Sequence, residues 1–292
     1  MAIKFNSNIQ NAYLGQGKIR QDTLTELAKD ALSINKKLVE ATRHSIFSGA
    51  PGVGKTWTFT LLIKQHKLRF VIITAGMSEI EITSRLAYGR ANLKKGEELI
   101  ILVDDADDVV FDNIKSLNRW KIATADIDPY WSYPKDISTT IIKAEKSKNF
   151  GLAKALKSFR TAGSLGLDIP LDRARVIILC NTDLEDEKAL SKKMFSSAEA
   201  VIDRFKYERL EMPWQEKWGW LAHVLSNSQP FEEDYGVVLD DLQKKELLNF
   251  LYTNWINLKS RHGASYRFVQ KLAEEQVNNP DDYLDRWARM VK

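Results

Sequence analysis

One segment of the chain has residue types and spacing that could bind a phosphate group. Residues 49–56 read Gly-Ala-Pro-Gly-Val-Gly-Lys-Thr and fit the pattern G-x-x-x-x-G-K-[ST] of a phosphate-binding loop. The glycines let successive backbone N–H groups point at one anion, and the following helix start adds more N–H groups. In such a loop Lys55 reaches the β- and γ-phosphates of a nucleotide, and the Thr56 hydroxyl binds Mg²⁺. The expected nucleotide-binding residues are Gly49, Ala50, Pro51, Gly52, Val53, Gly54, Lys55, Thr56 and Trp57.

A second segment, the apolar run Leu99–Val103, ends in the two carboxylates of Asp104 and Asp105. In nucleotide hydrolases with a phosphate-binding loop, a strand of this kind delivers an acid to the metal. We expect Asp104 to take part in the Mg²⁺ shell and Asp105 to be the base or positioner of the attacking water. The alternative is that the two carboxylates only end a strand. We expect Asp107 and Asp108 to begin the next helix, where carboxylates suit the helix dipole.

Short apolar runs alternate with helical stretches between residues 45 and 212. This alternation predicts an α/β fold, in which a parallel sheet is flanked by helices. Strands are expected at 45–47, 68–74, 99–103 and 176–180, and at the C-terminal end of 201–212. After Pro213 amphipathic helices are expected at 214–225, 240–258 and 266–277, with a last helix after the break at 279–281. We therefore predict an N-terminal segment with a helix (1–44), an α/β nucleotide-binding domain (45–212) and a small helical lid domain (213–292).

The composition is that of a soluble globular protein, with 44% apolar and 28% charged residues in 292. No stretch approaches 18 uncharged apolar residues, so we expect no membrane partner. The N-terminus lacks the apolar core of a signal peptide, which favours an intracellular, cytoplasmic setting. The single cysteine, Cys180, lies in an apolar run and is expected to be a buried strand residue. The net charge of +4 permits a nucleic-acid partner without indicating one.

Together these motifs resemble those of the AAA+ ATPases, which are P-loop NTPases. Their order and spacing agree over residues 45–275, and the set also resembles small AAA+ proteins of tailed bacteriophages. The matching segments are Gly49–Thr56 (Walker A), Leu99–Asp105 (Walker B), Val176–Thr182 (sensor 1 strand), Ala200–Phe205 (arginine-finger segment) and Ser265–Phe268 (sensor 2 helix).

The resemblance implies ATP hydrolysis, with ATP and Mg²⁺ as cofactors. It implies that Asn181 hydrogen-bonds the attacking water and a γ-phosphate oxygen, since an amide supplies both a donor and an acceptor. It implies that Arg204 acts in trans on the γ-phosphate of a neighbouring subunit, with Arg209 as a second candidate. Arg267 would touch the γ-phosphate from the lid. A finger in trans requires a homo-oligomer, usually a hexamer, and a phage protein of this type would work in the cytoplasm of an infected bacterium.

Each of these polar residues also has a simpler interpretation. Asn181 fits a strand-end residue that starts a turn. Arg204 fits a local ion pair with Asp203 or Glu208, and Arg267 fits a solvated helix residue. Those interpretations need no nucleotide.

The chain departs from the family pattern at the end of Walker B. Most AAA+ proteins have Asp-Glu there, whereas this chain has Asp104-Asp105. Asp105 is one methylene shorter than Glu, so its carboxylate lies farther from the position of the substrate. The sequence is therefore as compatible with a nucleotide-dependent structural switch that hydrolyses ATP slowly as with a fast motor.

The connection between Asp104 and Asn181 is longer than a minimal one and holds a basic insertion at about 121–175. Its aromatic run Tyr130–Tyr133 could stack on bases, while nearby basic side chains neutralise phosphates. The alternative is a helical insertion with a solvated basic face. In the tract that follows the aromatic run, residues 135–175, nine basic residues face only four carboxylates; the basic residues are Lys135, Lys143, Lys146, Lys148, Lys154, Lys157, Arg160, Arg173 and Arg175.

Tyr88 is a second residue that could contact a substrate, because this region of AAA+ rings can place an aromatic residue in the central pore, where it grips a polypeptide. Tyr88 also fits a plain helix over Ile82–Arg90. Two function classes follow: remodelling of DNA or a DNA-replication assembly, slightly favoured by the basic tract, and threading of a polypeptide by a protein-remodelling ATPase. The four histidines are scattered and lack the spacing of metal ligands.

Overall fold

The computed structural model of the chain describes residues 8–34, 44–160, 165–186, 192–232, 236–255, 258 and 265–291. Within these ranges the chain forms two compact units. An α/β unit comprises residues 28–49 and 56–209, and a helical unit comprises residues 1–27, 50–55 and 210–292.

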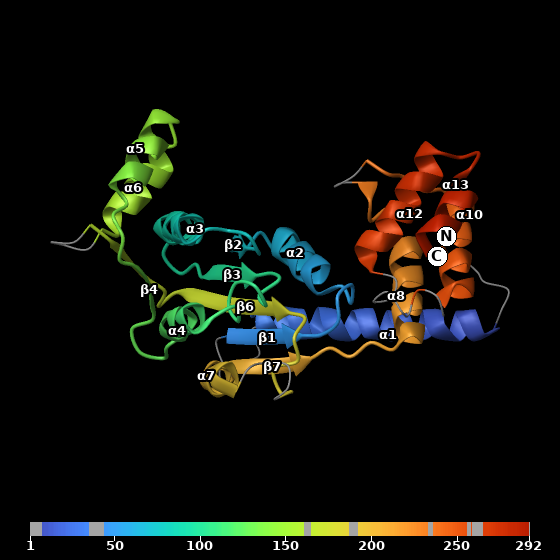
Figure 1. Cartoon of the computed structure of the whole chain (residues 1–292), viewed down its shortest axis with the longest axis horizontal. Coiled ribbons are helices and arrows are strands. Elements are labelled where there is room, and N and C mark those ends of the chain that lie inside the picture. Colours follow the sequence, from blue (N-terminus) through green and yellow to red (C-terminus); the bar gives the residue numbers. More distant parts are fainter. Residues whose placement is uncertain are drawn as a thin grey trace. The chain divides into compact units, whose positions relative to one another are not determined.

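The α/β unit contains a parallel sheet of five strands among the described residues (Figure 1). In spatial order the strands are β2 (Arg69–Ile73), β3 (Leu99–Val103), β6 (Ala174–Cys180), β1 (His44–Ser48) and β7 (Phe205–Arg209). Every adjacent pair is parallel. The predicted parallel α/β fold is confirmed, and the carboxyl ends of the strands meet at one edge of the sheet.

Helices bury both faces of this sheet, as expected for parallel strands. One face packs under α3 (Glu79–Ala91), α4 (Ile114–Ala123) and α7 (Lys192–Ile202) in a single apolar cluster. On the other face the ring of Phe47 contacts the ring of Phe59 from α2 (Lys55–Gln65), with centroids 4.9 Å apart. All five residues of β3 are buried as a result, which explains their unbroken apolar sequence.

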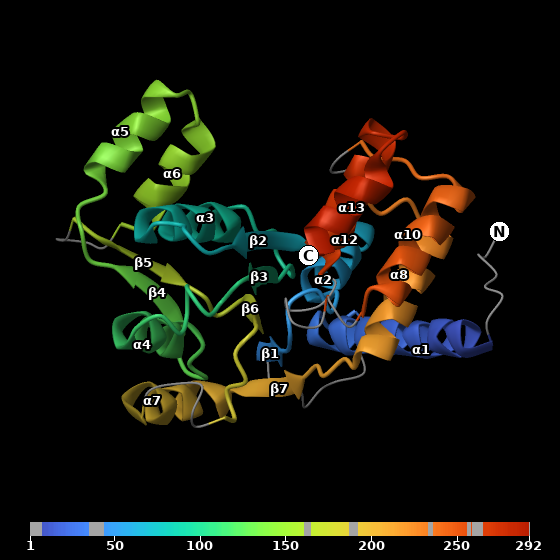
Figure 2. The same ribbon diagram turned by 45° about the vertical axis from the view of Figure 1, so that its right-hand side comes forward.

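The basic insertion is a two-stranded antiparallel ribbon that carries a pair of helices (Figure 2). The strands are β4 (Tyr130–Tyr133) and β5 (Leu167–Pro170), and the helices are α5 (Ser138–Lys146) and α6 (Phe150–Ser158). This arrangement shows that one sequence interpretation was wrong: most of the aromatic run Tyr130–Tyr133 is not available to stack on bases.

Trp131 and Tyr133 belong to the core, with exposed fractions of 2% and 8%. The Trp131 ring packs edge-on against Trp120, and its Nε1 donates a hydrogen bond of 3.0 Å to the Thr83 hydroxyl. Only Tyr130 of the three aromatic residues is exposed. The period of two in a strand places the residues at 131 and 133 on the same, inward face.

The helical unit contains α1 (Asn8–Ala31, up to Leu27), α8 (Trp214–Asn227), α10 (Asp241–Thr253), α12 (Tyr266–Asn278) and α13 (Tyr283–Val291). The predicted helices after Pro213 are confirmed, except that α10 ends at Thr253 and not at the expected residue 258. Asp240 begins α10 with a capping box, because its side chain accepts from the Gln243 N–H and the Gln243 side chain accepts from the Asp240 N–H.

A glycine contact brings α1 and α8 unusually close together. A Cβ on Gly219 would lie 1.8 Å from the Tyr13 carbonyl oxygen, and one on Gly17 would lie 1.9 Å from the Gly219 carbonyl carbon. Only glycine fits at either position. Beside this crossing Tyr13 packs against the rings of Trp214 and Trp218.

Candidate nucleotide site

The Gly-rich loop leaves β1 and leads directly into α2, which begins at Lys55. Gly52 has φ of 77° and Gly54 has φ of 85°, in the left-handed region that favours glycine. At Gly54 a second constraint applies, because a Cβ would lie 2.6 Å from Cζ2 of Trp220. The glycines therefore serve the curl of the backbone and a close approach to α8.

Lys55 belongs to the helical unit and is buried, with 7% of its surface exposed. Its Nζ donates to the carbonyl oxygen of Ala50 at 3.4 Å, so the side chain folds back over its own loop. An ammonium group held over the loop is placed to meet an anion bound there.

In the α/β unit the structure brings Thr56 and Asp104 together. The Thr56 hydroxyl donates a hydrogen bond of 2.7 Å to Oδ1 of Asp104. The Asp104 N–H bonds to the carbonyl of Ile73, which fixes Asp104 where β3 ends. A hydroxyl and a carboxylate oxygen side by side are hard oxygen ligands of the type that Mg²⁺ prefers.

Asp105 is half-buried and has a positive φ of 50°. Few L-residues adopt this left-handed conformation, but Asp and Asn do so several times more often than others. The next residue is anchored, since the Ala106 N–H bonds to the carbonyl of Leu179. The local backbone thus favours Asp over Glu at the position where the family pattern has Glu.

Asp107 and Asp108 do not begin a helix, contrary to our expectation. Residues 106–110 form turns, and α4 begins only after its N-cap, Asn113. The two carboxylate oxygens of Asp107 instead accept from the backbone N–H groups of Asn181, at 2.8 Å, and Thr182, at 2.9 Å. Asp107 therefore ties the segment after β3 to the segment after β6.

Asn181 follows the last residue of β6 and is exposed. Its neighbour Cys180 is buried at the end of the strand, as predicted. In the sheet Cys180 lies opposite Ser48 of β1, and the Gly49 N–H bonds to the Cys180 carbonyl at 3.2 Å. Asn181 and the first residue of the loop therefore lie at the same edge of the sheet.

The arginine candidates have contacts within the chain. Arg204 is half-buried, and its guanidinium donates to the carbonyl oxygen of Lys121 in α4 rather than to Asp203 or Glu208. Arg209 forms an ion pair of 3.0 Å with Asp183. Arg267 lies in the first turn of α12, but its side chain falls outside the described part of the chain.

Two residues near the loop have no counterpart in the sequence interpretation. Lys217 of α8 is 5% exposed, and its Nζ donates to the carbonyl oxygen of Pro51 at 3.3 Å. Burial, and next the charge of Lys55, lower the pKa of Lys217 to about 8. Trp220, whose ring contacts Gly54, donates its Nε1–H to the side chain of Gln21. The sequence of Trp214–Trp220 indicates an aromatic-rich helix. It does not indicate that this helix packs on the Gly-rich loop, so it could not identify Lys217 and Trp220 as residues near the loop.

The family model described as "ATPase family associated with various cellular activities (AAA)" matches residues 45–120. This match supports an AAA+ family ATPase. It extends from β1 to α4 and so includes the Gly-rich loop and the acidic end of β3, but not Asn181, Arg204 or Arg267. No curated protein matches the chain.

AAA ATPases bind nucleotide with Mg²⁺, and the residues at the sheet edge fit this pair. Among the described residues no cluster of three or more His, Cys, Asp or Glu side chains could hold a metal ion. A site that supplies Thr56 and Asp104 alone suits Mg²⁺ bound jointly by protein and phosphate oxygens. Within the described ranges no helix is long and apolar enough to cross a membrane.

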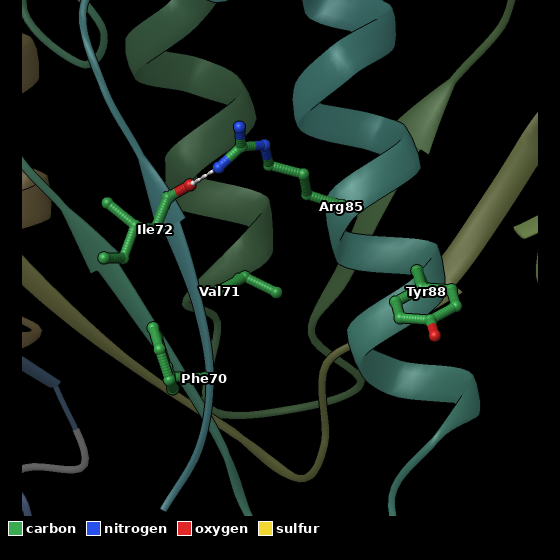
Figure 3. Close-up of a pocket in the computed structure, with 5 residues that line it drawn as sticks. All are labelled: Phe70, Val71, Ile72, Arg85 and Tyr88. Carbon is green, nitrogen blue, oxygen red and sulfur yellow. Dashed lines mark hydrogen bonds between the residues drawn. The ribbon is translucent and has the colours of Figure 1, made fainter. Parts of the chain in front are cut away.

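A shallow pocket lies elsewhere in the α/β unit, between β2 and α3 (Figure 3). Its lining residues are Phe70, Val71, Ile72, Arg85 and Tyr88, and none is a predicted nucleotide ligand. Arg85 donates to the carbonyl of Ile72 at 2.8 Å, which caps part of the exposed edge of β2. Tyr88 lies within α3, and its ring contacts the position of Gly151 on α6.

Proposed function

We propose that this protein is a Mg²⁺-dependent ATPase of the AAA+ type that couples ATP hydrolysis to the remodelling of a macromolecule. The observation that best supports it is the 2.7 Å hydrogen bond between Thr56 and Asp104, which joins the two nucleotide motifs at one sheet edge. In this proposal residues 45–212 form the nucleotide-binding domain and residues 213–292 the lid.

The loop Gly49–Thr56, with Trp57 beside it, would hold the phosphates of ATP through backbone N–H groups and the Lys55 ammonium. Thr56 and Asp104 would hold Mg²⁺, which when bound neutralises charge on the phosphate oxygens. The Asp105 carboxylate accepts a proton from the attacking water. Asn181 orients that water, and the Asp107 carboxylate fixes the backbone of Asn181.

The active species in this proposal is a homo-oligomer, most simply a hexamer, in which Arg204 completes the site of the neighbouring subunit. Members of the AAA family commonly oligomerise, and an arginine near the γ-phosphate stabilises charge in the transition state. Arg204 would have to exchange its bond to the Lys121 carbonyl for the phosphate. Arg267 would contact the same phosphate from the lid.

We propose DNA, or a DNA-replication assembly, as the first candidate client. The exposed basic residues of α5, α6 and the adjoining segments support this choice; they are Lys143, Lys146, Lys148, Lys154 and Arg160, whereas Lys157 pairs with Glu145 at 2.6 Å. Phe150, with 65% of its surface exposed, replaces the buried aromatic run as a candidate stacking residue. Arg173 and Arg175 are not counted among the candidate DNA contacts, because their side chains bind within the protein. Arg173 donates to the carbonyls of Lys94 and Glu97, and Arg175 pairs with Glu98.

The second candidate is a polypeptide client, supported by the half-exposed Tyr88 with 47% of its surface accessible. A slow nucleotide switch is the third, since Asp105 replaces the usual Glu. The motif order alone underlies the proposal that the protein works in the cytoplasm of a phage-infected bacterium.

The test of the proposed activity is ATP binding and phosphate release with and without Mg²⁺, in the wild type and in Lys55→Ala. We expect the substitution to abolish turnover, because it removes the charge that meets the phosphates. Equal turnover in both proteins would refute the proposal.

The client is tested by binding of single- and double-stranded DNA over a salt series with ATP present. Phosphate contacts predict an affinity that falls steeply with salt, and Lys146→Gln with Lys148→Gln should reduce that slope. No binding at low salt would favour a polypeptide client.

A further inference from the structure

The helical unit places two lysine side chains on one short loop. Lys55 reaches the carbonyl oxygen of Ala50 at 3.4 Å, and Lys217 reaches the carbonyl oxygen of Pro51 at 3.3 Å. Their exposed fractions are 7% and 5%. Two adjacent carbonyls of the loop thus each accept from a buried ammonium group.

The burial of Lys217 beside another ammonium group has an electrostatic cost in the unliganded protein. Lysine is almost never fully buried unless it is paired with an opposite charge. The carbonyl of Pro51 satisfies a hydrogen bond of Lys217 but cannot neutralise it. The repulsion is reflected in the lowered pKa of Lys217, for which burial is the first cause and the charge of Lys55 the second. An anion bound at the loop would neutralise this buried positive charge and so be stabilised by it.

The position of Lys217 is fixed by close packing around it. Two residues further along α8, Gly219 crosses Gly17 of α1 at a distance that excludes any side chain. One residue later, the Trp220 ring lies against Gly54, and its Nε1 donates to Gln21. The loop, α8 and α1 therefore hold Lys217 over residues 50–55.

We propose that Lys217 is a second phosphate-binding lysine, which neutralises a di- or triphosphate held by the loop together with Lys55. This inference rests on the proposed nucleotide-binding function and extends it to a helix outside both nucleotide motifs. It assigns α8 a direct role in binding the phosphates, in addition to its packing role.

The test compares Lys217→Met with Lys244→Met by calorimetric titration with ADP and with ATP. Lys244 is a matched control: it lies in the same unit, is 5% exposed, and donates to the carbonyl of Ser228 at 3.1 Å. Lys217→Met should weaken both affinities by about 10- to 100-fold, the range of a charge-assisted hydrogen bond. Lys244→Met should leave them within about twofold, well below that range.

A second measurement separates binding from a merely structural role. Unliganded Lys217→Met should melt at or above the wild-type temperature, because a buried charge has been replaced by an apolar side chain. At pH 8.5 the wild type should take up protons on binding ADP, since the phosphate raises the pKa of Lys217. Titrations in two buffers of different ionisation enthalpy measure this uptake, which Lys217→Met should lose.

The outcomes are distinguishable. A wild type that binds no nucleotide refutes the proposed function itself. A wild type that binds, with Lys217→Met equal to it, refutes only the role of Lys217. If the variant both melts lower and binds more weakly, loss of the proton uptake supports direct phosphate contact, and unchanged uptake overturns it.

Discussion

The positive φ of Asp105 leads to a prediction about the shorter acid at the end of β3. Asp105 has φ of 50°, a conformation that costs most L-residues about 1–2 kcal/mol and that Asp and Asn tolerate better. Replacing Asp105 by Glu restores the usual family residue but loses this tolerance. We therefore expect Asp105→Glu to be less stable by about 1 kcal/mol and to hydrolyse ATP more slowly than the wild type.

Asp105→Asn isolates the chemistry from the backbone. Asn has the same shape and the same tolerance of the left-handed region, so stability should change by less than about 0.5 kcal/mol. The amide cannot accept a proton from water, so turnover should fall by about 10²- to 10⁴-fold, the usual contribution of a general base. ATP affinity should be nearly unchanged.

The measurements are melting temperature, ATP affinity and phosphate release. A loss of about 1 kcal/mol corresponds to about 2–4 °C in a unit of this size. Asp108 provides controls in the same turn, because it is exposed and is not among the residues with positive φ. Asp108→Glu and Asp108→Asn should match the wild type in all three measurements. Wild-type turnover in Asp105→Asn would exclude Asp105 as the base, and an unaltered melting temperature in Asp105→Glu would refute the backbone reasoning.

Arg204, Gly219 and Lys217 each give a separate prediction. Arg204→Ala should bind ATP normally but not hydrolyse it, and mixing it with Asp105→Asn subunits should restore part of the activity; no rescue in demonstrably mixed oligomers would argue against action in trans. Gly219→Ala should lower the melting temperature strongly, by a destabilisation of about 3 kcal/mol or more, because its Cβ would lie 1.8 Å from the Tyr13 carbonyl oxygen. Gly15→Ala is its control, since a Cβ there meets nothing within 4 Å, and equal melting of the two variants would contradict the close crossing of α1 and α8. The pKa of Lys217, lowered from 10.5 to about 8, means that the folded protein releases a proton that the unfolded chain keeps until higher pH. Stability should therefore rise between about pH 8 and 10.5, by up to about 3 kcal/mol. The urea midpoint of the wild type should increase between about pH 7.5 and 9.5, whereas that of Lys217→Met should not. Equal increases of the midpoint in the two proteins would refute this prediction.

The sequence determined the features that depend on residues close together in the chain. The loop at 49–56 is recognisable because glycine, lysine and threonine act within a few residues of each other. The central strands β3 and β6 are recognisable because strands buried on both faces are almost continuously apolar. Apolar periodicity likewise predicted the helices after Pro213. The fold class and the pairing of Walker A with Walker B therefore follow from the sequence alone.

Tertiary structure decided the features that depend on residues far apart in the chain. Trp131 reads as an exposed aromatic beside lysines, but packing against Trp120 makes it part of the core. Asp107 reads as a helix start, but it binds the backbone of residues 181 and 182. Lys217 reads as an ordinary helix lysine, and only the close packing of α8 on the loop buries it over Pro51. Local propensity cannot specify these contacts, because their energies arise from desolvation and packing that exist only once the chain has folded.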